Sequence, residues 1–232
     1  MDVIVPCAGL SSRFPNLKPK YLLEDNDGKL MIENVISKMF GKNNIYISLL
    51  KEHVDKYDSY NIVKKKFDKF IEIVVIDNLT KGPAETVVLT LEKIKNDGPF
   101  LVRDCDSFFD FKFNNNGNFV FTSKLSNNKL IKNPEQLGYV VKNKNSIVAS
   151  IIEKKIVSDD FCVGGYQFNR KTSFINNFKM VVDNHKEIFI SHVISSMIKN
   201  LEIFHIQEVI NYINVGTVDN WNLFTSNKNI MA

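Results

Sequence analysis

The chain has 232 residues, of which 44% are hydrophobic and 24% are charged, ordinary values for a globular protein with its own core. Thirty Lys and Arg against 26 Asp and Glu leave a net charge of +4, thinly spread, so we expect no nucleic-acid partner. No stretch approaches the ~20 apolar residues of a membrane span, so no membrane association is expected either. Cys7, Cys105 and Cys162 lack the spacing of a metal site. We interpret them as buried residues of a reducing compartment and expect a cytoplasmic protein.

The first half of the sequence alternates short apolar runs with amphipathic stretches. Strands are predicted at 3–6, 44–50, 72–76 and 100–102. Apolar residues recur at helical spacing over 29–40 and 82–94. Such alternation is typical of βαβ units and a mostly parallel sheet.

The pattern changes in the second half. Strands are predicted at 118–124, 138–142, 146–153, 161–168, 203–207 and 210–215. Helices are predicted near 172–182, 187–199 and 218–225. With no linker and no repeat, the sequence predicts one α/β domain over 1–232, Rossmann-like, with a mixed, mostly parallel sheet flanked by helices.

A small Gly/Ser-rich loop follows the first strand. It contains Ala8, Gly9, Ser11 and Ser12 and ends at Arg13, and Lys20 follows after a proline. Small side chains let backbone N–H groups approach a phosphate chain, while the two basic side chains supply charge. The loop lacks the Gly-Lys-Ser/Thr end of a P-loop and the G-x-G-x-x-G of a dinucleotide site. It therefore predicts a different kind of nucleoside triphosphate site.

Two carboxylates, Asp104 and Asp106, stand one residue apart at the end of the fourth strand. Mg²⁺ is usually held by one or two carboxylates together with substrate phosphates, which makes this pair a candidate metal site. The alternative is that either aspartate caps the following turn. Because ligands of open α/β sheets lie outside the carboxyl ends of the strands, we expect loops 7–13, 77–85 and 103–107 to form a single site.

The segment A-G-x-x-S-R followed by Pro19-Lys20 resembles the opening signature of the sugar-phosphate nucleotidyltransferases, a family with NDP-sugar pyrophosphorylases and choline-phosphate cytidylyltransferases. The alternative is a generic strand-to-helix turn with incidental basic residues. The resemblance implies that Arg13 and Lys20 are catalytic and that the loop binds the nucleotide. It also implies a nucleotide-binding half up to residue 110 and an acceptor-binding half over 111–232.

The resemblance further implies Mg²⁺, with Mn²⁺ as the substitute. Asp106 matches the family's metal aspartate in the strand-end pattern, and Asp104 is the less certain member of the pair. Asn214 stands where a second metal aspartate is common, before Gly216-Thr217. An amide oxygen still ligates Mg²⁺ but brings no charge, and an ordinary turn remains the alternative for this segment.

Other segments match the family in chain order. A base-recognition loop is implied at Gly82, Ala84 and Glu85, although the same residues alone describe a helix N-terminus with proline in its first turn. Acceptor-binding residues are implied at Gly138, Glu153, Lys154 and Gly164. Lys155 stands where the family usually has proline, so the loop beyond is expected to differ.

The expected function is transfer of a nucleotidyl group from CTP, UTP or dTTP to a phosphorylated sugar or small metabolite, with release of pyrophosphate, in surface polysaccharide biosynthesis. The expected partners are the NTP and that acceptor, and a homodimer is left open. The alternatives are a metal-dependent glycosyltransferase, for which Asp104-Cys105-Asp106 would be the D-x-D, and an inactive nucleotide-binding regulatory protein. The sequence does not specify the base, the acceptor or the pathway.

Overall fold

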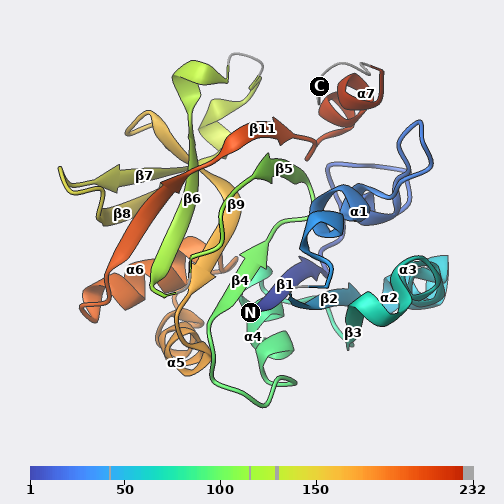
Figure 1. Ribbon diagram of the computed structural model, residues 1–232, viewed down its shortest axis with the longest axis horizontal. Helices are drawn as coiled ribbons and strands as arrows, with labels where there is room; N and C mark the ends of the chain where they lie inside the picture. Colours follow the sequence, from blue (N-terminus) through green and yellow to red (C-terminus); the bar gives the residue numbers. More distant parts are fainter. Residues whose placement is uncertain (42, 115, 129–130, 227–232) are drawn as a thin grey trace.

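The computed structural model describes residues 1–41, 43–114, 116–128 and 131–226. A central sheet runs through the molecule in the order β10-β6-β9-β4-β1-β2-β3 (Figure 1). Its strands are β1 (Asp2–Cys7), β2 (Asn44–Leu50), β3 (Ile71–Ile76), β4 (Phe100–Arg103), β6 (Asn118–Lys124), β9 (Asp160–Phe168) and β10 (Phe204–Glu208). Of these seven, β9 alone runs against the others, because it pairs antiparallel with both β4 and β6. The predicted mixed, mostly parallel sheet is confirmed.

Two smaller strand pairs flank this sheet. The hairpin of β7 (Gly138–Lys142) and β8 (Val148–Glu153) joins it through a single pairing of β7 with β9. The other pair consists of β5 (Ser107–Asp110) and β11 (Ile210–Asn214), which run antiparallel to each other. The second pair brings Asn214 opposite Ser107, immediately beside Asp106.

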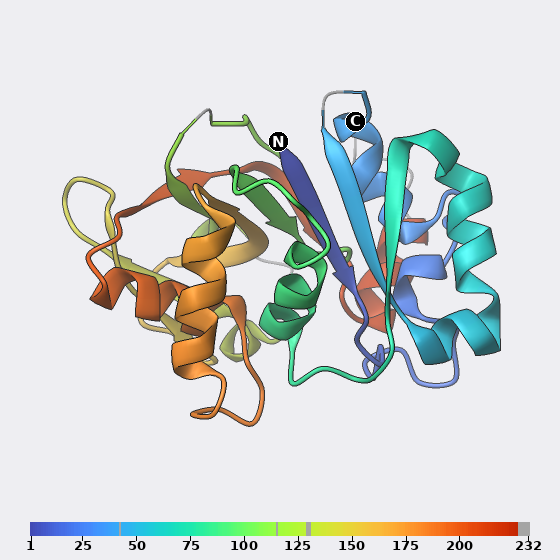
Figure 2. The same ribbon diagram turned by 90° about the horizontal axis from the view of Figure 1, so that it is seen from below.

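Helices cover both faces of the central sheet (Figure 2). They are α1 (Met31–Ile36), α2 (Lys51–Tyr57), α3 (Ser59–Phe67), α4 (Pro83–Leu91), α5 (Lys171–Val181), α6 (Ile190–Lys199) and α7 (Val218–Ser226). Helices α4, α5 and α6 pack on one face, and α1, α3 and α7 share a core with the other. The two faces therefore have separate hydrophobic cores.

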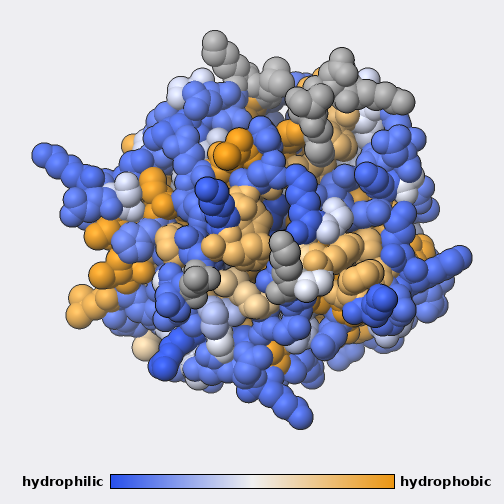
Figure 3. Space-filling model, in the orientation of Figure 1, coloured by the Kyte–Doolittle hydropathy of each residue, from blue (hydrophilic) through white to orange (hydrophobic). Residues whose placement is uncertain are grey.

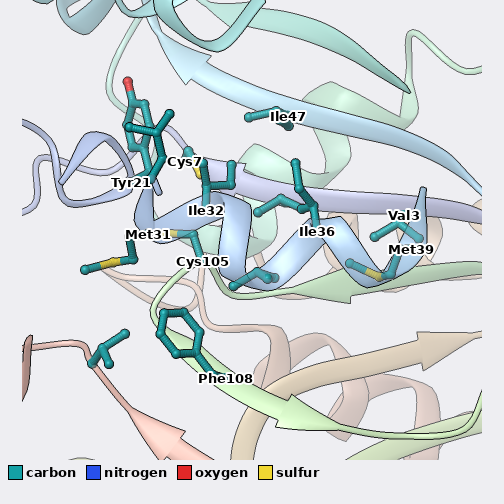
Figure 4. Close-up of a cluster of buried hydrophobic side chains, with 14 of the residues drawn as sticks. Val3, Cys7, Tyr21, Met31, Ile32, Ile36, Met39, Ile47, Cys105 and Phe108 are labelled. Carbon is teal, nitrogen blue, oxygen red and sulfur yellow. The ribbon is translucent and has the colours of Figure 1, made fainter. Parts of the chain in front are cut away.

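The alternation of β1 explains how one strand serves both cores. Val3 and Cys7 belong to the core on the side of α1, where Ile32 and Ile36 lie close to the strand (Figure 4). Ile4 belongs to the opposite core, with α4. Side chains of a strand point alternately to its two faces, so a strand covered on both sides reads as a continuous apolar run.

Some predicted boundaries were wrong. The helix predicted over 29–40 is six residues of α1 followed by a 3₁₀ turn, Ser37–Met39, before Gly41 adopts a positive φ of 75°. The helix predicted over 187–199 begins only at Ile190, because Phe189 has an extended backbone; this residue lines the cleft described below. Helix α2 and strand β5 were not predicted.

A buried ion pair ties the start of β1 to the start of α5. Lys171 Nζ lies 2.6 Å from Asp2 Oδ2, and both side chains are 4% exposed. The ammonium also donates to the Asn96 backbone oxygen at 2.8 Å, and Asn44 Nδ2 donates to Asp2 Oδ1 at 2.9 Å. Buried charges are tolerated when they are paired and hydrogen-bonded, as here. The pair links the start of α5 to the start of β1.

The face of the molecule seen in Figure 3 is largely hydrophilic. Hydrophobic residues gather there near the centre, at the left and to the right of the centre. Within the described ranges, no helix has both the length and the apolar character needed to cross a bilayer. Limited hydrophobic exposure of this kind is ordinary for folded proteins.

Candidate active site

The three loops expected to converge do meet, at one cleft of about 640 Å³. Residues 6–14, 79–83 and 104–106 line it, together with residues from the β7–β8 hairpin, β9 and the segment before α6. The carboxyl ends of β1, β3 and β4 face the same edge of the sheet, because these strands are parallel and share the path through β1 and β2. The fold thus places the cleft where open α/β sheets bind ligands.

The loop after β1 offers backbone donors to this cleft. Among the described residues, none accepts a hydrogen bond from the backbone N–H groups of residues 9–13. Ser11 has a positive φ of 55°, and its Oγ accepts a hydrogen bond from the Lys20 backbone N–H at 3.1 Å. Space is also free at Gly9, where an added Cβ would meet nothing within 4 Å. Five consecutive donors on a loop open to solvent suit an anion such as a phosphate chain.

The two basic residues predicted to be catalytic meet on one carboxylate. Lys20 Nζ lies 2.6 Å and Arg13 Nη2 3.0 Å from Asp106 Oδ2. Burial opposes ionisation of Asp106, but the two cations outweigh it and hold the pKa of this carboxyl below its usual range. Asp106 in turn raises the pKa of Lys20, against the effect of burial. Asp106 and Lys20 are therefore both ionised at neutral pH.

Asp104 has a different environment, although it is only two residues from Asp106. Burial, and then the neighbouring Asp106, raise the pKa of Asp104 to about 6. Its backbone N–H donates to the Gly164 oxygen at 2.8 Å, and its carboxylate packs against Gly164, where an added Cβ would lie 2.4 Å from Oδ2. Gly164 has a positive φ of 77°, so both space and backbone geometry require glycine there.

Arg103 fixes the turn that presents the two aspartates, a role that the sequence did not reveal. It is 1% exposed and its guanidinium lies 3.5 Å from the centre of the Phe109 ring. It donates to the Ser107 backbone oxygen at 3.1 Å, and Ser107 Oγ donates to the Val163 oxygen at 2.7 Å. These contacts bind both ends of the turn to β9, so the aspartates sit on a rigid support.

The oxygens of Asp106 and Asn214 face a common point. A Cβ added to Gly216 would lie 2.8 Å from Asp106 Oδ2 and 3.1 Å from both Asn214 Oδ1 and Arg13 Nη1. The Asn214 oxygen accepts a hydrogen bond from the Gly216 N–H at 2.8 Å, and Val215 N–H donates to the Asp106 backbone oxygen at 3.0 Å. One carboxylate and one amide oxygen are a donor set that fits Mg²⁺ when phosphates complete its coordination. Within the described ranges, no three His, Cys, Asp or Glu side chains form a fuller cluster.

The predicted base-recognition loop borders the cleft, and its glycine is required by packing against another segment of the chain. An added Cβ on Gly82 would lie 2.7 Å from the Ile188 backbone oxygen, so packing of two chain segments requires this glycine. Ala84 is fully buried and its N–H donates to the same oxygen at 3.2 Å. Glu85 accepts a hydrogen bond from the Lys81 backbone N–H. Neither Ala84 nor Glu85 lines the cleft, whereas Gly82 does.

Three of the four predicted acceptor-binding residues line the cleft. Gly138 and Gly164 do so together with Glu153, whose carboxylate would lie 3.0 Å from a Cβ on Gly138. Burial raises the pKa of Glu153, although a hydrogen bond from Ser191 opposes this effect. Lys154 does not line the cleft. Its ammonium is 3.9 Å from Glu187 Oε2 and 5.0 Å from the centre of the Phe189 ring.

Part of the cleft lining comes from a segment of the chain that no motif indicated. Lys186, Glu187 and Phe189 line the cleft from this segment, which precedes α6, and Tyr166 lines it from β9, next to the predicted Gly164. The Ile188 N–H donates to the Lys81 oxygen at 2.8 Å, which joins this segment to the loop after β3. No local sequence pattern identifies such residues, because their position depends on pairing across a hundred residues.

Comparison with known proteins identifies the architecture. No family model matches the chain, and no curated protein sequence matches it. Among solved structures, the nucleoside-diphosphate-sugar pyrophosphorylase from Vibrio cholerae RC9 superposes with a TM-score of 0.83 at 21% identity, covering 97% of this chain and 100% of that one. The chain has the nucleotidyltransferase fold.

The names of two further solved structures with this fold mention other substrates. The inositol-1-phosphate CTP transferase from T. maritima has a TM-score of 0.74 at 17% identity, covering 94% of this chain and 90% of that one. The CTP:phosphocholine cytidylyltransferase from Streptococcus pneumoniae has a TM-score of 0.70 at 21% identity, covering 97% of each chain. The nucleotidyltransferase fold is thus shared across different acceptors, and the cleft itself has to indicate the chemistry.

Proposed function

We propose that this chain is an NTP-dependent nucleotidyltransferase, which joins the nucleotidyl group of a pyrimidine NTP to a phosphorylated small molecule and releases pyrophosphate. The observation that carries the proposal is the position of Arg13 and Lys20, paired with Asp106, beside five backbone N–H groups for which no described residue is an acceptor. This combination suits a triphosphate chain and the negative charge that develops when it is attacked. The nucleotidyltransferase fold also supports this proposed activity.

In the proposed reaction, a phosphate oxygen of the acceptor attacks the α-phosphorus in line. The new P–O bond forms as the bond to the β-phosphate oxygen breaks, and pyrophosphate leaves with the electron pair. Arg13 holds the leaving phosphates, and Lys20 neutralises charge between the α-phosphate and the acceptor phosphate. The acceptor phosphate is already ionised and needs no general base, in keeping with a cleft whose described lining contains no histidine.

Asp106 and Asn214 would hold Mg²⁺ or Mn²⁺. When bound there, the ion would supply charge neutralisation at the phosphate oxygens. Asp106 therefore has two tasks, because it also orients Lys20 and Arg13. CTP, UTP and dTTP as donors, a cytoplasmic location and a role in surface polysaccharide biosynthesis are further parts of the proposal.

The direct test is pyrophosphate release from a grid of four NTPs against a panel of phosphorylated acceptors. Release that requires both a pyrimidine NTP and one acceptor class is expected. Binding of NTP without release with any acceptor would instead favour an inactive nucleotide-binding protein. Consumption of a nucleotide sugar without pyrophosphate would favour a glycosyltransferase.

The metal proposal predicts the effect of Asn214→Asp. The hydrogen bond from the Gly216 N–H to this side chain can still form in the variant. The added negative charge would lie close to Gly216, as the Asp106 carboxylate does. The variant should therefore reach half-maximal activity at several-fold lower Mg²⁺ concentration. The measurement is an Mg²⁺ activation curve at saturating substrates. Superimposable curves for both proteins would remove Asn214 from the metal site.

A further inference from the structure

The segment before α6, residues 185–189, lines one side of the cleft and supports the loop after β3. Three of its residues line the cleft. Between them, Ile188 is fully buried, donates its N–H to the Lys81 oxygen at 2.8 Å and accepts a hydrogen bond from the Ala84 N–H at 3.2 Å. Any contact that holds this segment therefore also positions the loop at 81–84.

His192 holds the segment at the first turn of α6. Phe189 is the N-cap of this helix, and its N–H donates to His192 Nδ1 at 3.3 Å. The His192 N–H donates in return to the Phe189 oxygen at 3.2 Å. This is the reciprocal arrangement of a capping box, with histidine where glutamate or glutamine is usual. Among the described residues, the Phe189 N–H has no other acceptor.

The contact requires a neutral histidine. Both ring nitrogens of an imidazolium carry a proton, so a protonated His192 has no lone pair to accept the Phe189 N–H. A positive charge would also lie at the N-terminus of α6, where the helix dipole is unfavourable to cations. Protonation of His192 therefore removes one hydrogen bond and adds an unfavourable interaction with the helix.

The surroundings of His192 further oppose its protonation. The ring of His185 stacks on it, with centres 3.8 Å apart and planes inclined by 13°. Burial, and then His185, lower the pKa of His192 in the folded protein. The other titratable groups on this segment, on α6 and on the elements packed against it do not shift this pKa; they are Asp183, Lys186, Glu187, Lys199, Glu153, Lys154, Glu85, Lys171 and Lys179.

We propose that His192 is a positioning residue, which holds the segment before α6 and the loop at 81–84 while it is neutral and loosens both as the pH falls. The released segment takes up a proton more readily than the packed one. The packed arrangement is therefore fully stable above the ordinary histidine pKa of 6.5 and weakens as the pH falls from there through the lower folded-state value. The consequence for nucleotide binding rests on the proposed function, whereas the loosening of the segment does not.

The first measurement is amide hydrogen exchange of the protein without ligand, at about pH 7.5 and about pH 5.5, on either side of an ordinary histidine pKa. Peptides covering 185–190 and 81–86 report on the two segments. After correction for the intrinsic pH dependence of exchange, both should exchange about fivefold faster or more at the lower pH, because each unit of pKa difference changes the opening equilibrium about tenfold.

The matched variant is His192→Gln. Glutamine at this position makes the same capping contact and does not titrate, so the corrected exchange rates of both peptides should be equal at the two pH values. His205→Gln is the control, because this histidine is exposed on β10 and lies outside the cleft lining. It should respond to pH as the wild type does. A merely structural role of His192 would leave the pH response in His192→Gln.

The second measurement is the Kd of CTP, UTP and dTTP at the same two pH values. Wild type and His192→Gln should bind the preferred nucleotide equally at the higher pH. At the lower pH the wild type should bind it about threefold more weakly or worse than the variant, since part of the opening equilibrium has to be reversed on binding. Asp104, whose pKa is about 6, titrates in both proteins, so the comparison isolates His192.

The outcomes separate this inference from the proposed function. Corrected exchange that is equal at both pH values in the wild type, or that accelerates equally in His192→Gln, would overturn the role of His192. Acceleration that His192→Gln abolishes would support it. Acceleration of 185–190 without 81–86 would overturn the link to the loop. Failure of every nucleotide to bind at either pH would contradict the proposed function, and the exchange result would still decide this inference.

Discussion

Replacing Lys20 with methionine is expected to lower kcat/KM by about 10²–10³-fold, the usual cost of removing a preorganised donor to a developing anion. Its ammonium lies 2.6 Å from Asp106 Oδ2 and belongs to the cation pair that faces the phosphate loop. The fold should survive, since Arg13 continues to pair with Asp106 and the side chain borders an open cleft. The measurement is steady-state pyrophosphate release, together with thermal unfolding of both proteins.

Lys18→Met provides a matched control for this prediction. Lys18 is exposed, lies two residues away and does not line the cleft, so its replacement changes the net charge equally. It should leave kcat/KM within about twofold, because exposed charges interact weakly through water. Retention of more than a third of the wild-type kcat/KM by Lys20→Met would contradict the assigned role of the lysine.

Replacing Lys171 with methionine is expected to lower the free energy of unfolding by about 3–5 kcal/mol, because it leaves Asp2 buried without its partner. Both side chains are 4% exposed, and the Lys171 ammonium also donates to Asn96. The measurement is urea denaturation at pH 7. Lys179→Met, an exposed change on the same helix, should have little effect. The double variant Asp2→Asn with Lys171→Met should recover part of the loss, since no charge then remains buried.

The stabilisation that the Asp2–Lys171 pair provides should depend on pH. Burial opposes ionisation of Asp2, but hydrogen bonds from Lys171 and Asn44 outweigh it and lower its pKa in the folded protein. The pair's contribution is therefore complete above the ordinary carboxyl pKa of 3.8 and is lost as the pH falls through the lower folded-state value. The difference between wild type and Lys171→Met should shrink in that acidic range. A difference that stays constant as the pH falls from 7 to well below 3.8 would show that the lysine acts through packing alone.

The parts of the site that sequence could indicate are those encoded locally. The loop from Ala8 to Arg13 and the pair Asp104 and Asp106 each follow an apolar strand. Because the carboxyl ends of parallel strands lie at one edge of the sheet, the two segments can be expected to lie close together. Strand β5 was missed because its partner β11 lies a hundred residues away, and a four-residue run has little pattern of its own. Helix α2 was missed because His53 is its sole fully buried residue, so the apolar spacing is weak.

Long-range packing also decides what individual residues do. Gly82 looks like a base-binding glycine from its neighbours, but contact with Ile188 is what excludes a side chain there. Lys154 follows Glu153 as the motif requires, yet its own φ of 57° and its contact with Phe189 keep it outside the cleft lining.

The antiparallel strand β9 has a consequence for the nascent chain. It fills the space between β4 and β6, so β4 has only β1 beside it until residues 160–168 have been made. At five to twenty residues per second, a ribosome needs on the order of several seconds to travel from β4 to β9. During that interval an apolar strand presents unpaired N–H and C=O groups, a template for association with other chains. Chains arrested before residue 160 should therefore aggregate more readily than chains arrested after β9 has emerged, which sedimentation of stalled translation products would measure.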